Sequence, residues 1–309
     1  EVIGRAGETL CSGRVPGKGN VSPNTPECVA ATKEQGSAMT QVVAEALLNA
    51  SKRAVALIQN AGSVRQGIVA GDITIDTVYL VLPFSNFLYE LEMTGQEILD
   101  TLEGAGQFAG SVSSGSHPYA AGMRWCFNVS SSKGSRFTNI EVWDKNVEGG
   151  SWVSLVLSQT YVVATNDYLA SGQDGFSTML KVRKSGRGVN TYMDCTQVLI
   201  DYVGRKGSIK SPPAADFSHK QLSWCNSAGY PDAINPFVLF AEIRAAVGNM
   251  QRCLLLAQQT AFAAASISLE QFRELYSTAE FSVEGPATNS KAFLPVFASP
   301  GFILETIPS

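Results

Sequence analysis

The sequence has few of the side chains on which metal and redox sites depend. It contains two histidines, His117 and His219, about a hundred residues apart, and six cysteines without a C-x-x-C pair. Zinc ribbons and thioredoxin-like redox sites need cysteines at that close spacing, so the sequence argues against both classes. Histidines in no metal-binding spacing indicate no metal site, and His117 is interpreted as a loop residue.

Long apolar runs and a strong charge of one sign are also lacking. The 309 residues carry a net charge of −4, and their lysines and arginines are scattered, so a nucleic-acid polymer is not an expected partner. No stretch reaches the roughly 18 uncharged apolar residues that a membrane span needs. With 45% hydrophobic residues, the chain can bury the core of one large or two ordinary domains.

No signal peptide is visible, and the first residue is Glu1, which fits a processed or partial chain. Three N-glycosylation sequons begin at Asn20, Asn49 and Asn128. Single sequons arise by chance in cytosolic chains. Together with a low charge and an even number of cysteines, these three favour a secreted glycoprotein, extracellular or periplasmic.

Residues 1–35 are rich in Gly, Pro, Ser and Asn, and Cys11 and Cys28 flank a loop centred on Arg14. A Cys11–Cys28 disulfide would fix this loop, and closing it would contribute roughly 3 kcal/mol in the chain-entropy model. Two unpaired, small hydrophobic cysteines are the alternative.

Apolar periodicity and capping patterns predict an α/β domain over residues 1–210, with a mixed β-sheet and packed helices. The predicted helices cover residues 37–49, residues 95–103 after the capping box Thr94–Glu97, and a segment that Asp194 caps and that Gly204 and Gly207 stop. The predicted strands cover residues 54–58, 78–84, 87–91, 123–129, 137–143, 152–157 and 161–165. Residues 104–121 are predicted to form a glycine- and serine-rich loop.

A domain boundary is predicted near Pro213, and the rest of the chain, residues 211–309, reads as a mostly helical extension of unknown role. No catalytic constellation is visible there. Apolar segments such as residues 293–302 could exchange between subunits of a homo-oligomer, or they could pack on their own domain.

The stretch 166–176 follows an apolar strand pattern and contains Tyr168 and, between Gly172 and Gly175, Asp174. Such a loop could stack an aromatic ring on a flat ligand and accept hydrogen bonds from it. Arg65, in a polar turn after another strand, could bind phosphate in a bidentate way, although a surface arginine is the simpler interpretation. For Phe84, core packing is the default role.

Four stretches, residues 60–65, 82–86, 121–124 and 166–176, resemble in order and spacing the signature blocks of the 5′-nucleotidase C-terminal domain. The resemblance covers roughly residues 1–210. Several spaced blocks that agree are more specific than any single one.

This resemblance implies a substrate-binding domain whose partner is a nucleotide or nucleoside. The base would lie between Phe84 and Tyr168, and stacking is worth ~1–3 kcal/mol per base in nucleic-acid systems. Asn86 would hydrogen-bond the base edge, and Asp174 would accept the ribose hydroxyls. The implied phosphate ligands are Arg65, Asn60 and Arg14.

Two departures from the family pattern qualify this interpretation. Gln173 stands where the family usually has a glycine, so it could narrow or alter the sugar site. The family's two divalent metals belong to a separate catalytic domain, so no metal or cofactor is expected in this chain, which is predicted to be inactive alone. The alternative is a non-catalytic secreted glycoprotein that self-assembles into an extracellular structure.

Overall fold

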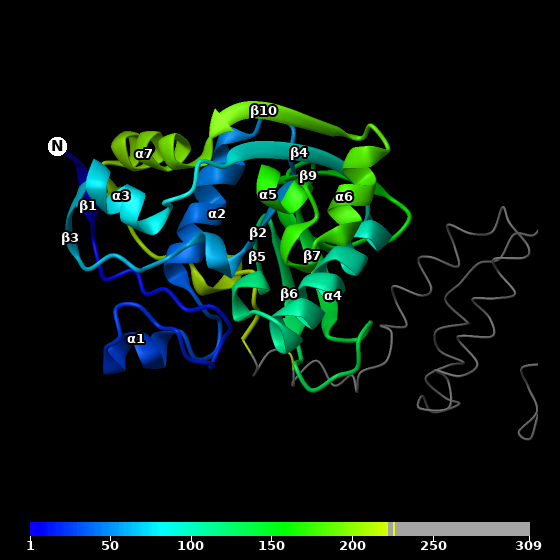
Figure 1. Cartoon of the computed structure of the whole chain (residues 1–309), viewed down its shortest axis with the longest axis horizontal. Coiled ribbons are helices and arrows are strands. Elements are labelled where there is room, and N and C mark those ends of the chain that lie inside the picture. Colours follow the sequence, from blue (N-terminus) through cyan, green and yellow to red (C-terminus); the bar gives the residue numbers. More distant parts are fainter. Residues whose placement is uncertain (222–224, 226–309) are drawn as a thin grey trace, which may run out of the picture. The chain divides into compact units, whose positions relative to one another are not determined.

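This computed structural model describes residues 1–221 and Cys225 (Figure 1). A mixed five-stranded sheet in the order β10-β4-β9-β2-β5 lies at its centre. The strands are β2 (Ala56–Asn60), β4 (Phe87–Thr94), β5 (Pro118–Ala121), β9 (Thr160–Asn166) and β10 (Gly188–Asp194). β2 and β9 are parallel, and the other neighbouring pairs are antiparallel. The predicted α/β class is therefore confirmed.

Side chains alternate between the two faces of this sheet. Leu57 and Ala164 belong to one core cluster, whereas their neighbours Ile58 and Val163 belong to the other. Successive side chains of a strand point to opposite faces, so a strand covered on both sides reads as an unbroken apolar run. This explains why the central strands could be predicted from apolar runs.

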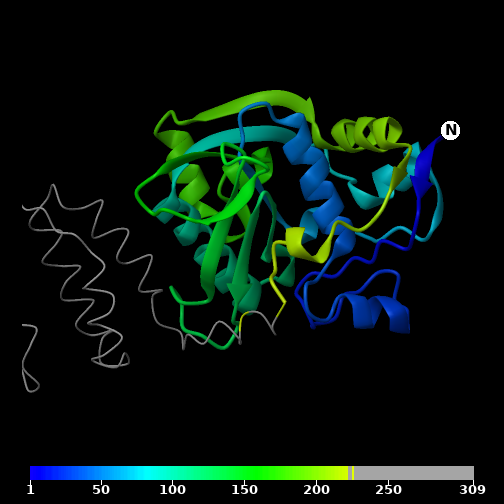
Figure 2. The same cartoon turned by 180° about the vertical axis from the view of Figure 1, so that it is seen from behind.

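Helices cover both faces of the sheet, as Figure 1 and the reverse view in Figure 2 show. One core cluster joins the sheet to α2 (Ala38–Ala50), α3 (Ile75–Val81) and α7 (Cys195–Lys206). The other joins it to α4 (Gly95–Ser111), α5 (Asp167–Ala170) and α6 (Ser177–Lys184). None of the helices in the described part of the chain has the length and apolarity to cross a membrane.

Two smaller sheets complete the described part. One has the order β6-β7-β8, with β6 (Met123–Phe127), β7 (Phe137–Asp144) and β8 (Ser151–Ser154). The other has the order β11-β1-β3, with β1 (Val2–Ala6), β3 (Gly71–Thr74) and β11 (Ser208–Ile209).

The chain stays packed on this fold after β11. Phe217, Ser218, His219 and Lys220 are buried, and Lys220 Nζ lies 2.9 Å from a Glu141 carboxylate oxygen. The boundary near residue 210 remains a prediction, and the predicted helical extension lies outside the described residues.

The predicted strand over residues 78–84 is wrong, because α3 occupies most of this segment. Val78 and Val81 are fully buried, whereas Tyr79 and Leu80 are 54% and 60% exposed. Burial of residues three apart is the period of a helix. Thr74 begins the helix in a capping box, which the high β-propensity of the following apolar run concealed.

The predicted loop over residues 104–121 is also partly wrong, because α4 continues to Ser111 and β5 begins at Pro118. Two glycines inside α4 permit close packing. A Cβ on Gly106 would lie 2.7 Å from the Phe137 ring, and one on Gly104 would lie 2.8 Å from the Gly175 carbonyl oxygen. These glycines therefore serve close approach and not chain reversal.

Smaller differences concern where elements end. The predicted strand 54–58 is shifted to Ala56–Asn60, and the strand 152–157 is shorter, ending at Ser154. α7 passes through Gly204 and ends at Lys206, and Gly207, whose φ is +67°, follows as its C-terminal cap.

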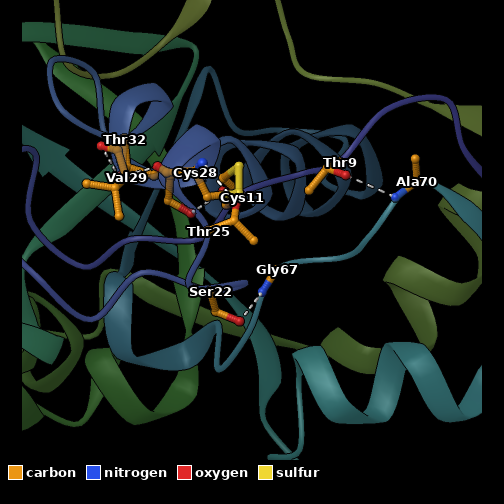
Figure 3. Close-up of a disulfide and its surroundings, with 10 residues drawn as sticks. Thr9, Cys11, Ser22, Thr25, Cys28, Val29, Thr32, Gly67 and Ala70 are labelled. Carbon is orange, nitrogen blue, oxygen red and sulfur yellow. Dashed lines mark hydrogen bonds between the residues drawn. A yellow bond between two sulfur atoms is a disulfide. The ribbon is translucent and has the colours of Figure 1, made fainter.

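The predicted Cys11–Cys28 disulfide is present and is drawn in Figure 3. It joins the N-terminal loop to α1 (Pro26–Ala31), where the Thr25 hydroxyl accepts a hydrogen bond from the Cys28 amide. The same loop is held to residues 67–70 by further hydrogen bonds, one of them between the Gly67 amide and the Ser22 hydroxyl.

A second disulfide joins Cys126 in β6 to Cys225 and was not predicted. Cys195 is free and buried in the described part of the chain. The sequon asparagines Asn20, Asn49 and Asn128 are all exposed, so each is accessible to glycosylation, which itself remains a prediction.

Removing the first disulfide with the double substitution Cys11→Ala and Cys28→Ala should lower the free energy of unfolding by about 3 kcal/mol, because the unfolded chain regains the entropy of the open loop. Urea unfolding of the double variant and of the parent measures this difference in the free energy of unfolding. Cys195→Ala is the matched control, since it removes a cysteine outside any disulfide. Equal unfolding free energies for the double variant and the parent would contradict the prediction.

Candidate functional site

The site residues that the sequence predicts lie where strands of the five-stranded sheet begin and end, at the edge of the sheet formed by these strand ends. The parallel strands β2 and β9 both end at this edge, with Asn60 and Asn166, and the antiparallel strands β4 and β5 both begin there. The connecting segments therefore meet beyond it. They are η1 (Ala61–Ser63), η2 (Ser114–Ser116), η3 (Gln173–Gly175), α5 and the loop 82–86. In open α/β sheets, ligands bind outside the carboxyl ends of parallel strands.

Asn60, Asp174 and Tyr168 form one hydrogen-bonded group. The buried Asn60 donates its side-chain amide to Asp174 Oδ2 at 2.9 Å, and the Tyr168 hydroxyl donates to Asp174 Oδ1 at 3.1 Å. Ser63 donates its hydroxyl to Asn60 Oδ1, which fixes the orientation of the amide. The carboxylate of Asp174 is thus held from two sides by residues of two different strand ends.

The Asp174 backbone has a φ of +55°, between Gly172 at +86° and Gly175 at +84°. An aspartate tolerates this left-handed conformation better than most residues, although at some cost. Gly104 of α4 lies directly against the Gly175 carbonyl, so the packed helix supports the turn from below. The sequence places a strained acid on a turn that the core holds in place, a feature typical of functional sites.

Partial burial of the ring and the neighbouring Asp174 carboxylate raise the pKa of Tyr168. The hydroxyl therefore stays protonated and remains a hydrogen-bond donor throughout the neutral range. Tyr168 as a whole residue is 41% exposed, so it is accessible to a ligand.

Phe84 and Arg65 form a second group. Phe84 is 44% exposed, and the Arg65 guanidinium lies 5.7 Å from the centre of its ring. The backbone amide of Arg65 donates to the Val81 carbonyl, which holds the two segments together. Phe84 is therefore not a core residue, and the default interpretation of this side chain is wrong.

The backbone at Asn86 and Phe87 connects the segments that carry the two groups. The Asn86 carbonyl accepts a hydrogen bond from the Cys195 amide at 2.9 Å. The next residue, Phe87, donates its amide to Asp167 Oδ1 at 3.0 Å, and Asp167 immediately precedes Tyr168. The loop that carries Phe84 and Asn86 is thereby fixed beside the turn that carries Tyr168.

Arg14 reaches the same edge from the N-terminal loop. Its guanidinium donates to the Ser114 hydroxyl at 3.4 Å, and Gly115 packs against Gly62 of η1. Gln173, in contrast, is exposed, and its backbone carbonyl accepts from the Phe176 amide.

Three residues of this edge had no role in the sequence-based interpretation. Ser63 and Asn166 support Asn60, since Asn166 donates to the Ser63 hydroxyl at 3.4 Å, and Ser114 meets Arg14. Ser63 and Asn166 lie within the stretches 60–65 and 166–176, so their place in those stretches was the available signal. Ser114 gave no such signal, because it lies in a glycine- and serine-rich segment.

A family model described as the 5′-nucleotidase C-terminal domain matches residues 18–182, more than half of the 309-residue chain. The chain belongs to this family. It is 35% identical over 191 residues to the NAD 5′-nucleotidase of Haemophilus influenzae, covering 60% of this chain and 31% of the relative. It is 34% identical over 180 residues to a probable 5′-nucleotidase of Treponema pallidum, with coverage of 56% and 30%. The chain thus matches about a third of the length of these relatives.

Solved structures agree with the family assignment. The structure of the Haemophilus influenzae NAD nucleotidase matches with a TM-score of 0.61 and 31% identity, over 71% of this chain and 38% of that one. A 5′-nucleotidase precursor from Thermus thermophilus matches with a TM-score of 0.58 and 26% identity, over 71% and 39%. The 5′-nucleotidase C-terminal fold therefore extends over most of the described residues.

The two histidines of this 5′-nucleotidase C-terminal domain meet in the core behind η2. His117 is fully buried and His219 is 3% exposed, and their Nε2 atoms lie 2.8 Å apart. His117 lies in the connection between η2 and β5, as the loop interpretation predicts, but its ring is buried and paired. The carbonyl of His117 accepts a hydrogen bond from the Ala61 amide, so the pair supports η1 as well.

The surrounding hydrogen bonds assign a proton to each ring. Gln41 donates its amide to the carbonyls of Ala120 and Asp216, so its oxygen accepts the Ser218 hydroxyl proton. When the Ser218 hydroxyl donates to Gln41, its oxygen accepts from His219 Nδ1, 3.2 Å away. His219 Nε2 is left as an acceptor, and His117 Nε2 donates to it. Because the buried His117 Nδ1 has no acceptor among the described residues that would stabilise a second proton, this arrangement leaves both rings neutral.

Burial lowers the pKa of His117 to about 3, and the charge of Lys18 acts in the same direction. Burial and the neighbouring His117 also lower the pKa of His219. The unfolded chain binds protons at both histidines below its ordinary pKa near 6.5, whereas the folded chain does not. Their contribution to stability is present above pH ~6.5 and is lost as the pH falls toward the folded values.

The free energy of unfolding should therefore fall by up to about 2.7 kcal/mol between about pH 7.5 and pH 5.5, or about 1.4 kcal/mol for each histidine. Urea unfolding at the two pH values measures this, and the chain contains no other histidine that would contribute. His219→Gln should reduce the pH dependence. A free energy of unfolding that does not change over this range would contradict the neutral, buried pair.

Proposed function

We propose that this domain recognises a nucleoside 5′-monophosphate, or the corresponding part of a larger nucleotide, for a nucleotide phosphohydrolase. The observation that carries the proposal is the convergence of Phe84 and Asn86 with the Tyr168–Asp174–Asn60 group at one edge of the sheet. A planar ligand can stack on exposed aromatic rings, and stacking of a base is worth ~1–3 kcal/mol in nucleic-acid systems.

The polar groups of the site suit the remaining parts of a nucleotide. Asp174 presents a carboxylate whose oxygens can accept ribose hydroxyls, and Asn60 and Tyr168 hold it in one orientation. Arg65 and Arg14 come from two separate segments of the same edge and can bind phosphate oxygens. Asn86 is assigned to the edge of the base. Gln173 is exposed and directly precedes Asp174, so its effect on the sugar site remains a prediction.

The family's metal chemistry does not fit the described residues. They contain no cluster of three or more His, Cys, Asp or Glu side chains that could hold a metal ion. Both histidines are used in the buried pair and cannot reach a ligand. The role proposed for the described residues is therefore binding and orientation of the substrate, and no hydrolytic step is assigned to them.

An extracellular or periplasmic location is part of the proposal. Two disulfides and three exposed sequon asparagines support it, because disulfides persist in oxidising compartments. The alternative of a self-assembling glycoprotein depends on segments outside the described residues, and no described feature favours it.

Tyr168→Ala should weaken AMP binding by about tenfold or more, because it removes a stacking ring and one of the two donors to Asp174. Isothermal titration of AMP into the whole chain and the variant measures the ratio. Tyr79→Ala is the matched control, since Tyr79 is an exposed tyrosine on α3.

The control variant should bind AMP like the parent. Failure of the parent to bind AMP at millimolar concentration would overturn the proposed function. So would a Tyr168→Ala variant with the affinity of the parent.

A further inference from the structure

Tyr192, near the end of β10, has a conformation that is unusual for an aromatic residue. Its backbone φ is +57°, and its side chain is 79% exposed. Left-handed backbone is strained for a bulky side chain, and such strain persists only where the surrounding structure holds it. A tyrosine in this strained and exposed position does not stabilise the fold, so its presence there needs another explanation.

Hydrogen bonds on both sides hold this conformation. The Tyr192 amide donates to Asn190 Oδ1 at 2.8 Å, and the Thr191 hydroxyl donates to the Leu88 carbonyl at 2.7 Å. The pairing of β10 with β4 shifts register between Asn190 and Asp194, so the strand is irregular at Tyr192, in the manner of a bulge. Bulges next to ligand sites re-aim a side chain, and here the side chain concerned is the Tyr192 ring.

Packing within the described part of the chain does not explain the ring. Its hydroxyl has no hydrogen-bond partner among the described residues, and its one ring contact is an edge contact with Phe87, at 6.5 Å between centroids. A residue kept in a strained and exposed conformation with so few contacts is a candidate for contact with a ligand.

The position of this pair relative to the site suggests which ligand group it contacts. Phe87 directly follows Asn86, and its amide is bonded to Asp167 beside Tyr168. On the β10 side, Asp194 pairs with Phe87 in the sheet, and the Cys195 amide binds the Asn86 carbonyl. The backbone that carries the two rings thus adjoins Asn86, the residue assigned to the edge of the base.

We propose that Tyr192, together with Phe87, recognises a planar or apolar group attached to the edge of the base, so that the domain prefers a base-substituted nucleotide to AMP itself. In this proposal, a substituent on the edge of the base that Asn86 hydrogen-bonds would extend toward the residues next to Asn86. Aromatic rings bind such a group by stacking and by edge-to-face contact. This inference rests on the proposed function, because it assumes that the base lies against Asn86.

The test compares AMP with AMP whose exocyclic amine carries a benzyl group, both titrated into the whole chain. The parent should bind the benzyl derivative about tenfold more tightly, as expected for one added stacking contact. Tyr192→Gly should bring the two affinities to the same value and leave the affinity for AMP unchanged. Tyr192→Phe keeps the ring and should retain the preference.

Tyr192→Gly should fold at least as well as the parent, because glycine adopts a positive φ without strain. Its melting temperature should be equal or higher, which separates a lost preference from a damaged fold. The inference is overturned if the parent shows no preference, or if Tyr192→Gly keeps it. If AMP does not bind, or Tyr168→Ala does not weaken it, the proposed function fails and this inference fails with it.

Discussion

The parallel pairing of β2 with β9 is the constraint on which the site depends. It places the ends of two strands, about a hundred residues apart in sequence, at one edge of the sheet, where Asn60 can donate to Asp174. Without this pairing, the left-handed turn at Asp174 would lack the partner that holds its carboxylate. The core on both sides of the sheet therefore stabilises the strand ends, and the strand ends position the polar groups.

At this edge, backbone strain is found in single residues, whereas the helices and strands that support them are tightly packed. Two residues with positive φ, Asp174 and Tyr192, lie in or next to the site, whereas the elements beneath them are well packed. α4 approaches the Asp174 turn so closely that a methyl group on Gly104 would collide with it. This arrangement suits a binding site that must present its ring and carboxylate in one geometry before the ligand arrives, since preorganisation lowers the entropy cost of binding.

Much of the fold around the site could be predicted from the sequence, whereas the ligand contacts of the site remain predictions. The central strands and the start of α4 could be predicted, because they depend on apolar runs and on the Thr94–Glu97 capping box. The run at Val78 was misread, because its β-branched residues suit a strand and only tertiary burial reveals the helical period. The His117–His219 pair could not be predicted, because 102 residues separate the two histidines and no local sequence pattern indicates that they are in contact.

The central proposal is that Phe84 and Tyr168 both stack on the same base. A double-mutant cycle on AMP affinity, with Phe84→Ala, Tyr168→Ala and both together, tests it most directly, because residues that share one partner are not additive. The account predicts that each single substitution weakens binding, and that the double variant differs from the sum of the two effects by about 0.5 kcal/mol or more. Strictly additive effects, or no effect of Phe84→Ala, would contradict it.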